Sequence, residues 1–357
     1  MRMLGIETSC DETSVAIVLD DGTVVTSLIA SQIERHRPFG GVVPEIASRE
    51  HLAHLMPLVT RALADAGLTL HDLDGIAVTA GPGLIGALLV GVAAAQGISF
   101  GSGIPLIPVN HLEGHIYSGY LRLESAATPV PERFLSLVVS GGHSSVYDVQ
   151  RDGLVMINRT RDDAGGEVFD KVAKFIGFPY PGGPQIERAG SGGDGSRFDL
   201  PIPTFKDESL DFSFSGLKST AIRLARQTGL ADVAAGRDGE EVPAVLADFC
   251  ASFQKAVGDQ LLDRLTRIWD RLLEKDDEPP AELVFAGGVA SNGELRERIS
   301  AWCDRRGITI RLAERRYCTD NGAMIAFAGW QKWGSRDRFD SRRVRAVSRI
   351  AAGTETF

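Results

Sequence analysis

The sequence predicts an α/β protein built from two related lobes, and three observations lead to this fold class. The chain has 357 residues, more than one single-core domain usually contains, so two domains or lobes are expected. Hydrophobic residues make up 43% of the chain, which is enough to fill ordinary protein cores. A layout of strand, polar loop, strand, turn and strand occurs twice.

The two copies of this layout begin near residues 3 and 134. Their apolar runs are residues 3–6, 15–19 and 23–29 in the first copy and residues 134–139, 146–149 and 154–157 in the second. Asp21-Gly22 and Asp152-Gly153 lie at the turns, where glycine supplies the positive φ that a tight hairpin needs. The repeat favours two related lobes that face one cleft. Two unrelated hairpins, which are common structures, are the alternative.

Hydrophobic periodicity predicts further elements. Apolar positions three or four residues apart run from Val245 to Leu272, which predicts one long amphipathic helix. The other expected elements are strands at residues 283–286 and 308–312 and a helix at residues 323–333. The longest apolar stretch, residues 84–95, is too short to span a bilayer, and we expect a buried helix there.

Charge and cysteine content limit the classes of function. The formal net charge is −9, so bulk charge cannot attract a nucleic acid, which would need a local basic patch or a partner protein. The four cysteines form no C-x-x-C pair, and the N-terminus lacks a basic segment followed by an apolar one. We therefore expect a reducing compartment, a cytoplasmic location and no membrane association.

The clearest chemical motif is His111-Leu-Glu-Gly-His115. Residues four apart share one helix face, so both imidazoles can reach one metal ion. Two unrelated histidines, one at a helix cap and one in a core, are the alternative. Glu113 is in the wrong position for a zinc protease, which needs His-Glu-x-x-His or His-x-x-Glu-His.

Asp320 is the candidate third ligand, and it lies in a polar loop just before the last predicted helix. Its alternative role is to cap that helix, since aspartate is common at helix N-termini. Two imidazoles and one carboxylate would favour iron or zinc over magnesium, and would leave coordination positions open for substrate or water.

Glycine-rich loops follow several of the predicted strands. They are Ala80-Gly-Pro-Gly83, Ser140-Gly-Gly-His143, Pro181-Gly-Gly-Pro184 and Gly287-Gly-Val-Ala-Ser-Asn292. Glycine lets a backbone approach phosphate closely and helix N-termini favour anions, so several such loops favour a nucleotide cleft. Carboxylates cluster nearby, for example Glu7, Asp11 and Glu12 in one loop. Ordinary turns and solvated surface charges are the alternatives.

A family resemblance rests on motifs that occur in order across roughly residues 1–330. They are Gly5-Ile-Glu-Thr-Ser-Cys-Asp-Glu-Thr13, Gly41-Val-Val-Pro-Glu45, His111-Leu-Glu-Gly-His115, Val139-Ser-Gly-Gly-His143, Asp163-Ala-Gly-Gly-Glu-Val-Phe-Asp-Lys171, Tyr180-Pro-Gly-Gly183, Asp211-Phe-Ser-Phe-Ser-Gly-Leu-Lys218, Gly287-Gly-Val-Ala-Ser-Asn292 and Thr319-Asp-Asn-Gly322. By these motifs the chain resembles the bacterial TsaD family, the tRNA threonylcarbamoyladenosine transferases once labelled O-sialoglycoprotein endopeptidases.

The resemblance implies a duplicated actin/hexokinase-like (ASKHA) fold with two lobes around a nucleotide cleft. The expected division is an N-terminal lobe at residues 1–110, a C-terminal lobe with helical insertions at 111–333 and an arginine-rich tail at 334–357. The tail lies beyond the family's usual pattern, and we expect it to be mobile or docked on the surface. Its arginines are Arg336, Arg338, Arg342, Arg343, Arg345 and Arg349.

The resemblance also implies a reaction and partners. Threonylcarbamoyl-AMP would donate its threonylcarbamoyl group to the exocyclic amine of the adenosine next to the anticodon. The acceptors would be tRNAs that read codons beginning with adenine, and AMP would leave. A paralogous partner subunit (TsaB type) and a small ATPase (TsaE type) would assist this metal-dependent acyltransferase.

Site residues are implied by the motifs that match. His111, His115 and Asp320 resemble the ligands of one divalent metal ion per subunit, with iron(II) the first expectation and zinc the second. The residues that resemble substrate contacts are Val138, Val139, Ser140, Gly141, Gly142, Asp170, Gly183, Glu187 and Asn292. Archaeal and eukaryotic relatives have a tyrosine ligand where this chain has Val138. Glu12 is the candidate general base, because its loop should face the cleft.

Other functions compete with this one. A carbamoyltransferase that acts on a small molecule would share the fold, the metal pair and a carbamoyl-adenylate, and differs only in its acceptor. A sugar-kinase-like phosphotransferase would need magnesium held mainly by carboxylates, which the histidine pair argues against. A non-enzymatic scaffold would bind nucleotide without modifying tRNA.

Overall fold

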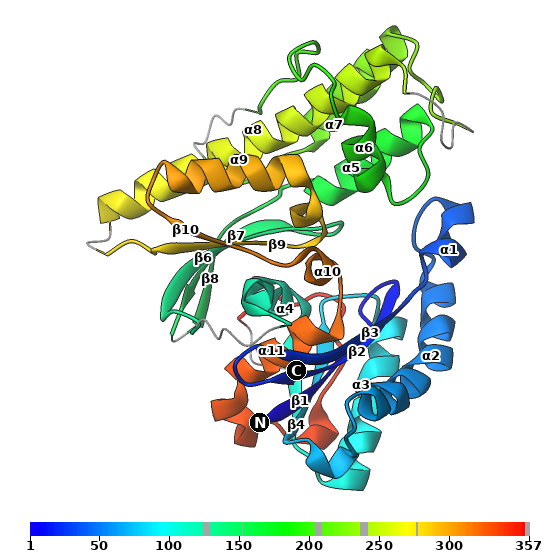
Figure 1. Ribbon diagram of the computed structural model, residues 1–357, viewed down its shortest axis with the longest axis vertical. Helices are drawn as coiled ribbons and strands as arrows, with labels where there is room; N and C mark the ends of the chain where they lie inside the picture. The colour runs from blue at the N-terminus through cyan, green and yellow to red at the C-terminus, as the bar shows by residue number, and fades with distance from the viewer. Residues whose placement is uncertain (124–128, 152, 204–208, 236–241, 276–277, 354–357) are drawn as a thin grey trace. The chain divides into compact units, whose positions relative to one another are not determined.

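The computed structural model describes residues 1–123, 129–151, 153–203, 209–235, 242–275 and 278–353 (Figure 1). The chain divides into two compact units. The first unit contains Met1–Pro131 and Ala313–Phe357, and the second contains Glu132–Leu312.

The first unit is built on a five-stranded mixed sheet with the order β3-β2-β1-β4-β5. Its strands are β1 (Arg2–Glu7), β2 (Glu12–Leu19), β3 (Val24–Ser31), β4 (Gly75–Gly81) and β5 (Leu106–Asn110). Strands β1, β2 and β3 pair antiparallel, whereas β4 and β5 run parallel to β1. Gly22 has a φ of 86° in the turn between β2 and β3, the positive value that the predicted hairpin requires.

The second unit repeats this sheet, with the order β10-β9-β6-β7-β8. Its strands are β6 (Arg133–Val139), β7 (Ser144–Gln150), β8 (Gly153–Arg159), β9 (Glu282–Ala286) and β10 (Thr309–Leu312). Strands β6, β7 and β8 pair antiparallel, whereas β9 runs parallel to β6 and β10 runs parallel to β9. The first unit has the same arrangement. The duplicated α/β fold predicted from the repeated layout is therefore confirmed. The turn residue Asp152 lies outside the described residues.

Helices cover both faces of the first sheet (Figure 1). They are α2 (Pro44–Asp65), α3 (Ile85–Ser102), α4 (His111–Tyr117) and α11 (Gly322–Gln331). The short helices α1 (Ile33–His36) and α10 (Arg315–Cys318) also belong to this unit. Leu4 and Ile6 of β1 belong to the core formed with α2 and α3. Side chains alternate along a strand, so Gly5 points to the other face, where α11 lies.

Contact between β1 and α11 is unusually close at Gly5. A Cβ atom added there would lie 2.0 Å from the carbonyl oxygen of Gly322 and 2.6 Å from the amide nitrogen of Ala326. Glycine is needed because no side chain fits that space. The first turn of α11, which follows Asp320, is thereby held against the sheet.

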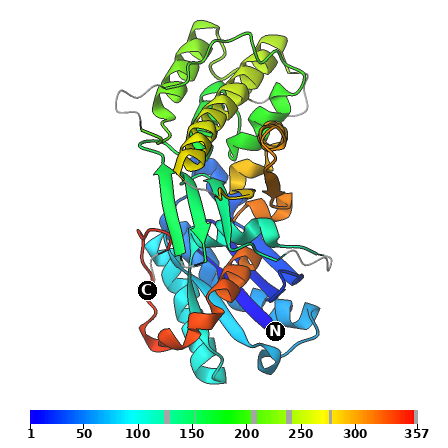
Figure 2. The same cartoon turned by 90° about the vertical axis from the view of Figure 1, so that its left-hand side faces the viewer.

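Helices of the second unit are α5 (Gly165–Ile176), α6 (Gly182–Gly190), α7 (Ser215–Gln227), α8 (Ala244–Lys275) and α9 (Gly293–Asp304). The predicted long amphipathic helix is confirmed as α8, which buries Phe249, Phe253, Leu261 and Leu265 on one side. Helices α8 and α9 lie on the same side of the second sheet in both views (Figures 1 and 2). The predicted strands at 283–286 and 308–312 correspond to β9 and β10, and the predicted helix at 323–333 corresponds to α11.

The observed units differ from the boundaries expected at residues 110/111 and 333/334. The chain changes unit after Pro131 and returns to the first unit at Ala313. Helix α11 packs on β1, β2 and β4 and on α4, which places both helices in the first unit. The tail belongs there as well, since Val344 is buried in the core of the first unit.

One helix of the described residues, α3, is long and apolar enough to cross a membrane by length and composition. About a third of its residues (33%) are buried. Its buried residues include Val92 and Ala95, which lie in the core with α2 and β4. The helix of a protein core passes the same test, so this finding alone is weak evidence of a membrane span.

The Asp162 carboxylate caps the N-terminus of α7. It accepts hydrogen bonds from the amides of Phe214 and Ser215 at 2.8 and 3.1 Å, and from the hydroxyls of Ser213 and Ser215 at 2.5 and 2.7 Å. The burial of Asp162 would raise its pKa, but these donors lower it below the usual value. The ionised carboxylate therefore stabilises the fold.

Asp162→Ala is expected to lower the free energy of unfolding by about 1–2 kcal/mol at pH 7, as loss of a capping side chain does. Because the folded-state pKa is depressed, this stabilisation is present above the unfolded value of about 4 and is lost as pH falls through the folded value. Urea unfolding of the wild type and of Asp162→Ala should show a gap at pH 7 that begins to narrow below about pH 4 and keeps narrowing as pH falls further. A difference in unfolding free energy that is the same at pH 7 and well below pH 4 would contradict this role. Asp65→Ala on the exposed side of α2 is the control.

Candidate functional site

Helix α4 carries both histidines. Strand β5 ends at Asn110, whose side chain accepts a hydrogen bond from the amide of Leu112 at 2.9 Å and so caps the helix. His111 and His115 then lie one turn apart on the same face. Both are buried, and their ring centroids are 4.8 Å apart. The spacing argument for one helix face is confirmed by this geometry.

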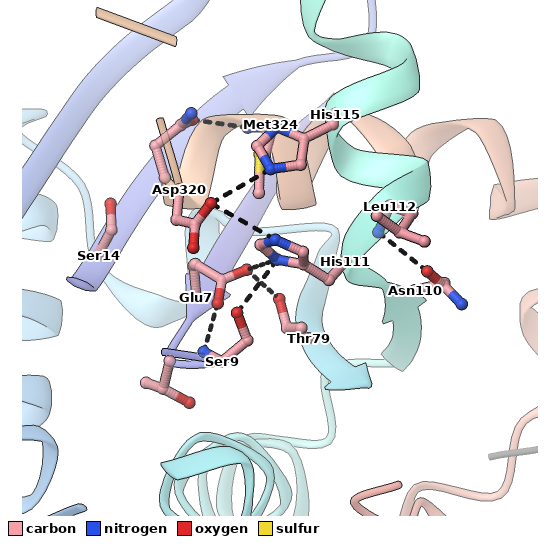
Figure 3. Close-up of polar contacts among 12 residues, drawn as sticks. Glu7, Ser9, Ser14, Thr79, Asn110, His111, Leu112, His115, Asp320 and Met324 are labelled. Atoms are coloured by element: carbon pink, nitrogen blue, oxygen red, sulfur yellow. Dashed lines mark hydrogen bonds and ion pairs between the residues drawn. The ribbon is translucent and has the colours of Figure 1, made fainter. Parts of the chain in front are cut away.

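Asp320 joins the two histidines from the loop between α10 and α11 (Figure 3). Its Oδ1 lies 3.4 Å from His111 Nε2 and 3.2 Å from His115 Nε2. Asn321, rather than Asp320, caps α11, because its side chain accepts from the amide of Met324 at 2.9 Å. The capping alternative for Asp320 is therefore wrong.

These three side chains form a group that could hold a metal ion. One ligand atom from each of His111, His115 and Asp320 lies within 4.8 Å of the others. Two imidazole nitrogens and one carboxylate oxygen are donors that suit iron and zinc, so the donor set fits the expected metal. No other such group of histidine, cysteine, aspartate or glutamate was found in the described part of the chain.

The Glu7 carboxylate contacts Nδ1 of His111, the ring nitrogen that does not face Asp320. Its Oε2 lies 3.0 Å from His111 Nδ1 and accepts a hydrogen bond from Thr79 Oγ1 at 2.6 Å, while Oε1 accepts from the amide of Ser9 (Figure 3). Glu7 is fully buried at the end of β1. A proton on His111 Nδ1 can be donated to Glu7, which leaves Nε2 for a ligand on the Asp320 side.

The electrostatics of this group favour positive charge. Burial would lower the pKa of His111, but the carboxylates of Asp320 and Glu7 hold it well above its usual value. Burial would likewise raise the pKa of Asp320, and the two histidines hold it well below its usual range instead. A cation between these ligands replaces the proton that they otherwise bind.

Glu12 lies at the start of β2, in the same unit as the metal group. Its Oε1 accepts a hydrogen bond from Ser31 Oγ at 2.8 Å. Its Oε2 is buried and has no hydrogen-bond partner among the described residues. Burial raises the pKa of Glu12 to about 8. A carboxylate that gains and loses its proton near neutral pH is suited to general base catalysis.

The prediction of a loop at residues 138–142 is wrong for its first two residues, because β6 of the second unit continues to Val139. Val138 and Val139 lie in the strand with fully buried side chains, whereas Gly141 and Gly142 are exposed. Ser140 donates its amide hydrogen to the carbonyl of His143 at 2.7 Å. Its own carbonyl accepts from Gly166 at 3.0 Å. The exposed part of this loop thus consists of glycine backbone at the N-terminus of α5.

The other predicted substrate contacts lie around two helix N-termini of the second unit. Asp170 Oδ1 accepts from the amide of Gly182 at 2.7 Å, where α6 begins and Gly183 follows. Glu187 Oε1 accepts from the amide of Gly293 at 2.7 Å, where α9 begins. Asn292 caps α9 through the amide of Leu295 at 3.1 Å. Helix N-termini favour anions, and here the Asp170 and Glu187 carboxylates occupy one amide each, which leaves the neighbouring amides for a phosphate group.

Several supporting residues could not be identified from the sequence. Glu7 was one of many acidic residues near glycine loops, and Thr79 carried no signal. Thr79 is 72 residues from Glu7, and Glu7 is 104 residues from His111, so only the folded sheet brings them together.

The repeated sheets define a two-unit α/β protein of the actin and hexokinase type, and comparison with solved structures supports this class. HypF from T. kodakarensis matches with a TM-score of 0.59 at 13% identity, over 94% of this chain and 48% of that one. Component A of (R)-2-hydroxyglutaryl-CoA dehydratase from Acidaminococcus fermentans matches with a TM-score of 0.51 at 14% identity, over 94% of this chain and 99% of that one.

Sequence comparison identifies the family. The family model described as tRNA N6-adenosine threonylcarbamoyltransferase (TsaD) matches residues 23–327. A relative of that name from Sorangium cellulosum is 44% identical over 352 residues, which cover 95% of this chain and 94% of the relative. Another from Brucella canis is 47% identical over 341 residues, covering 93% and 90%. The chain belongs to the TsaD family.

Proposed function

We propose that this chain transfers the threonylcarbamoyl group from threonylcarbamoyl-AMP to the exocyclic amine of the adenosine next to the anticodon, in tRNAs that read codons beginning with adenine. AMP is the leaving group. The observation that carries this proposal is 44% identity, across 95% of the chain, to a relative named for the transfer. The intact group of His111, His115 and Asp320 agrees with a working enzyme rather than a scaffold.

His111, His115 and Asp320 would hold one divalent ion per subunit, with iron(II) the first candidate and zinc the second. When bound, the ion would supply a Lewis acid for the carbamoyl carbonyl of the donor. Glu7 would fix the tautomer and the ring orientation of His111 through Nδ1. Val138 occupies the place where archaeal and eukaryotic relatives have a tyrosine, so no phenol ligand is expected there.

The second unit would bind the AMP part of the donor. Backbone N–H groups of Gly141 and Gly142, and the amides of the first turns of α6 and α9 that are not bonded to Asp170, Glu187 or Asn292, would meet the negative charge of the phosphate, which grows as AMP leaves. Asp170, Gly183, Glu187 and Asn292 would contact the adenosine. Glu187 is suited to a ribose hydroxyl, because a carboxylate that accepts one amide hydrogen bond can accept others.

Glu12 would take the proton that the adenosine amine loses when it attacks the carbamoyl carbon. In this step the bond between the adenosine nitrogen and the carbamoyl carbon forms, and the bond between that carbon and the phosphate oxygen of AMP breaks. The amine proton passes to Glu12. Its buried, unpartnered Oε2 supports this role.

A paralogous TsaB-type subunit and a small TsaE-type ATPase would complete the system. Exposed large apolar side chains lie along α2 and α3, which pack on each other. They are Leu52, Met56, Ile85, Leu89 and Phe100, with exposed fractions of 47–83%. An apolar surface of this kind suits a protein partner, and we assign it to the paralogous subunit.

The proposed reaction is tested with donor labelled in its threonyl part. The chain is mixed with both partners, the donor and an unmodified tRNA, and label bound to tRNA is separated from label bound to small molecules. We expect label in tRNA, and none in a tRNA with guanosine at the acceptor position. Label in a small molecule alone would favour the small-molecule carbamoyltransferase, and release of no AMP at all would favour a scaffold.

Glu7→Gln is expected to weaken metal binding about 10- to 100-fold, because loss of a carboxylate behind a ligand histidine has that effect. The change keeps the size of the side chain and removes the charge that faces His111 Nδ1. Competition with a chelator of known affinity measures the dissociation constant directly. Thr79→Val, which removes one hydrogen bond to Glu7, is the matched control and should change it less than about tenfold. An unchanged affinity in Glu7→Gln would contradict the role of Glu7.

A further inference from the structure

The C-terminal strap, defined as residues 341–353, is fastened along the first unit rather than free in solvent. Gln96 Nε2 donates to the carbonyls of Ser341 and Val344 at 2.8 and 3.1 Å. Val347 donates its amide hydrogen to the carbonyl of Ala80 at 2.8 Å. Val344 itself is 6% exposed in the core. Of the two states expected for the tail, the docked one is confirmed for these residues.

The loop after β4 is shaped to receive the strap. A Cβ atom at Gly81 would lie only 2.1 Å from the carbonyl oxygen of Val347, so a side chain there would displace the strap. Gly83 donates its amide hydrogen to the carbonyl of Ser348 at 3.3 Å. This glycine loop, which the sequence assigned to nucleotide binding, is therefore in contact with the chain's own C-terminal segment.

The strap ends on the helix that carries the metal group. Asn110, which caps α4 and precedes His111, donates its side-chain amide hydrogen to the carbonyl of Ala351 at 3.0 Å. Gly353 donates its amide hydrogen to Glu113 Oε1 at 2.9 Å. Glu113 lies between the two histidines in the sequence but points to the other side of α4, since residues two apart face in nearly opposite directions around a helix. Its other oxygen pairs with Lys332 Nζ at 2.6 Å. The end of the strap thus packs on α4, the helix that carries both histidines of the metal group.

The strap is strongly basic on an acidic protein. It contains four arginines and no acidic residue, whereas the whole chain has a net charge of −9. Arg342 and Arg343 are 78% and 85% exposed and share Asp340. Arg345 and Arg349 are also exposed, and neither makes an ion pair or a side-chain hydrogen bond with the described residues. Two cations without partners are thus held on an ordered backbone.

We propose that the strap is an RNA-binding surface, on which Arg345 and Arg349 bind phosphates of the tRNA that presents its adenosine to the metal group. The inference rests on the proposed function for the identity of the RNA. A chain with net negative charge binds RNA through a local basic patch or a partner protein, and the strap supplies such a patch, since guanidinium groups match phosphate oxygens in pairs. Arg349 is two residues from Ala351, whose carbonyl accepts a hydrogen bond from Asn110, the residue before His111, so Arg349 belongs to the same part of the first unit as the metal group.

A charge run on a tail is usually only solvated. That alternative predicts a free backbone, because an unattached tail keeps its conformational entropy. The bonds to Gln96, Ala80, Gly83, Asn110 and Glu113 oppose it. These contacts hold the charged residues of the strap in defined positions, which binding of a ligand at a fixed place requires.

The test is binding of a synthetic, unmodified anticodon stem-loop RNA at several salt concentrations, with the full chain and both partners present. R345Q/R349Q is expected to raise the dissociation constant about tenfold at low salt and to lower the slope of log affinity against log salt by about 1–2. R345K/R349K, which keeps both charges, should restore most of the affinity. R151Q/R305Q removes two exposed charges from the second unit and should change neither quantity.

The metal content of every variant should equal that of the wild type, since no metal ligand is changed. In transfer assays R345Q/R349Q should raise the KM for tRNA with little change in kcat. An affinity and a salt slope equal to those of the wild type would overturn the inference, even if tRNA is modified normally. If the slope falls as expected but wild-type protein modifies no adenosine, the proposed function fails and the RNA-binding surface stands.

Discussion

Replacing Asp320 by alanine is expected to remove most of the bound metal and to lower threonylcarbamoyl transfer by about a hundredfold or more, since outer residues that support a metal site already cost 10- to 100-fold. The structure gives the reason. Asp320 Oδ1 is within 3.4 Å of both histidine Nε2 atoms, so it supplies the anionic donor of the group. Without it two neutral imidazoles remain, which bind a divalent ion weakly.

Elemental analysis of the purified protein gives metal per chain, and single-turnover transfer gives the rate. Asp320→Asn keeps the side-chain volume and should show the same two losses, which separates ligation from packing. Asp65→Ala, an exposed acid of the same unit, is the control and should lose neither. Full metal occupancy in Asp320→Ala, with an unchanged unfolding midpoint, would contradict the ligand set.

Glu12→Gln is expected to lower kcat about a hundredfold or more, the usual contribution of a general base. Burial raises the pKa of Glu12 to about 8, so only part of the protein carries the ionised base at pH 7. The value of kcat/KM for the wild type should therefore rise with pH, with a midpoint near 8, and level off above it. The glutamine variant cannot accept the proton, so its slow rate should lack this rise.

Ser31→Ala gives a sharper version of this test. The Ser31 hydroxyl donates to Glu12 and favours the ionised form, so its loss should move the midpoint to higher pH and leave the plateau rate nearly unchanged. Metal content should be normal in both variants, because neither residue belongs to the metal group. A glutamine variant with the rate and pH profile of the wild type would remove Glu12 from the mechanism.

The local pattern of the sequence predicted most elements of the fold. Strand–turn–strand repeats gave both hairpins, because alternation and Asp-Gly turns depend on neighbouring residues. The regular spacing from Val245 to Leu272 gave α8 for the same reason. The unit boundaries could not be found this way. Helix α11 returns to the first hairpin across more than 300 residues, as the bond from the Gly322 amide to Ser14 Oγ in β2 shows, and no local period records that contact.

The candidate site was predicted unevenly. The spacing of His111 and His115 fixes a shared helix face, so that pair could be predicted directly. Asp320 and Asn321 are adjacent polar residues before one helix, and only the structure shows that the asparagine is the cap and the aspartate faces the histidines. Glu7 and the C-terminal strap act through contacts between distant residues, so sequence pattern alone gave them no role.

The second unit illustrates a different limit. Asp170, Glu187 and Asn292 were predicted as substrate contacts, and each also forms a hydrogen bond at the start of a helix. Such bonds position the helix N-termini that would bind the donor's phosphate, so these residues can serve both structure and binding. Their role in donor binding stays a prediction.

The most direct test of the central claim is the nucleoside composition of tRNA after reaction. Unmodified tRNA is incubated with the chain, its partners and threonylcarbamoyl-AMP, digested to nucleosides and analysed by mass. We expect an adenosine that carries one threonylcarbamoyl group, formed in proportion to the AMP released and reduced about a hundredfold or more with Asp320→Ala. Unmodified adenosine throughout, with metal-loaded protein and all partners present, would contradict it.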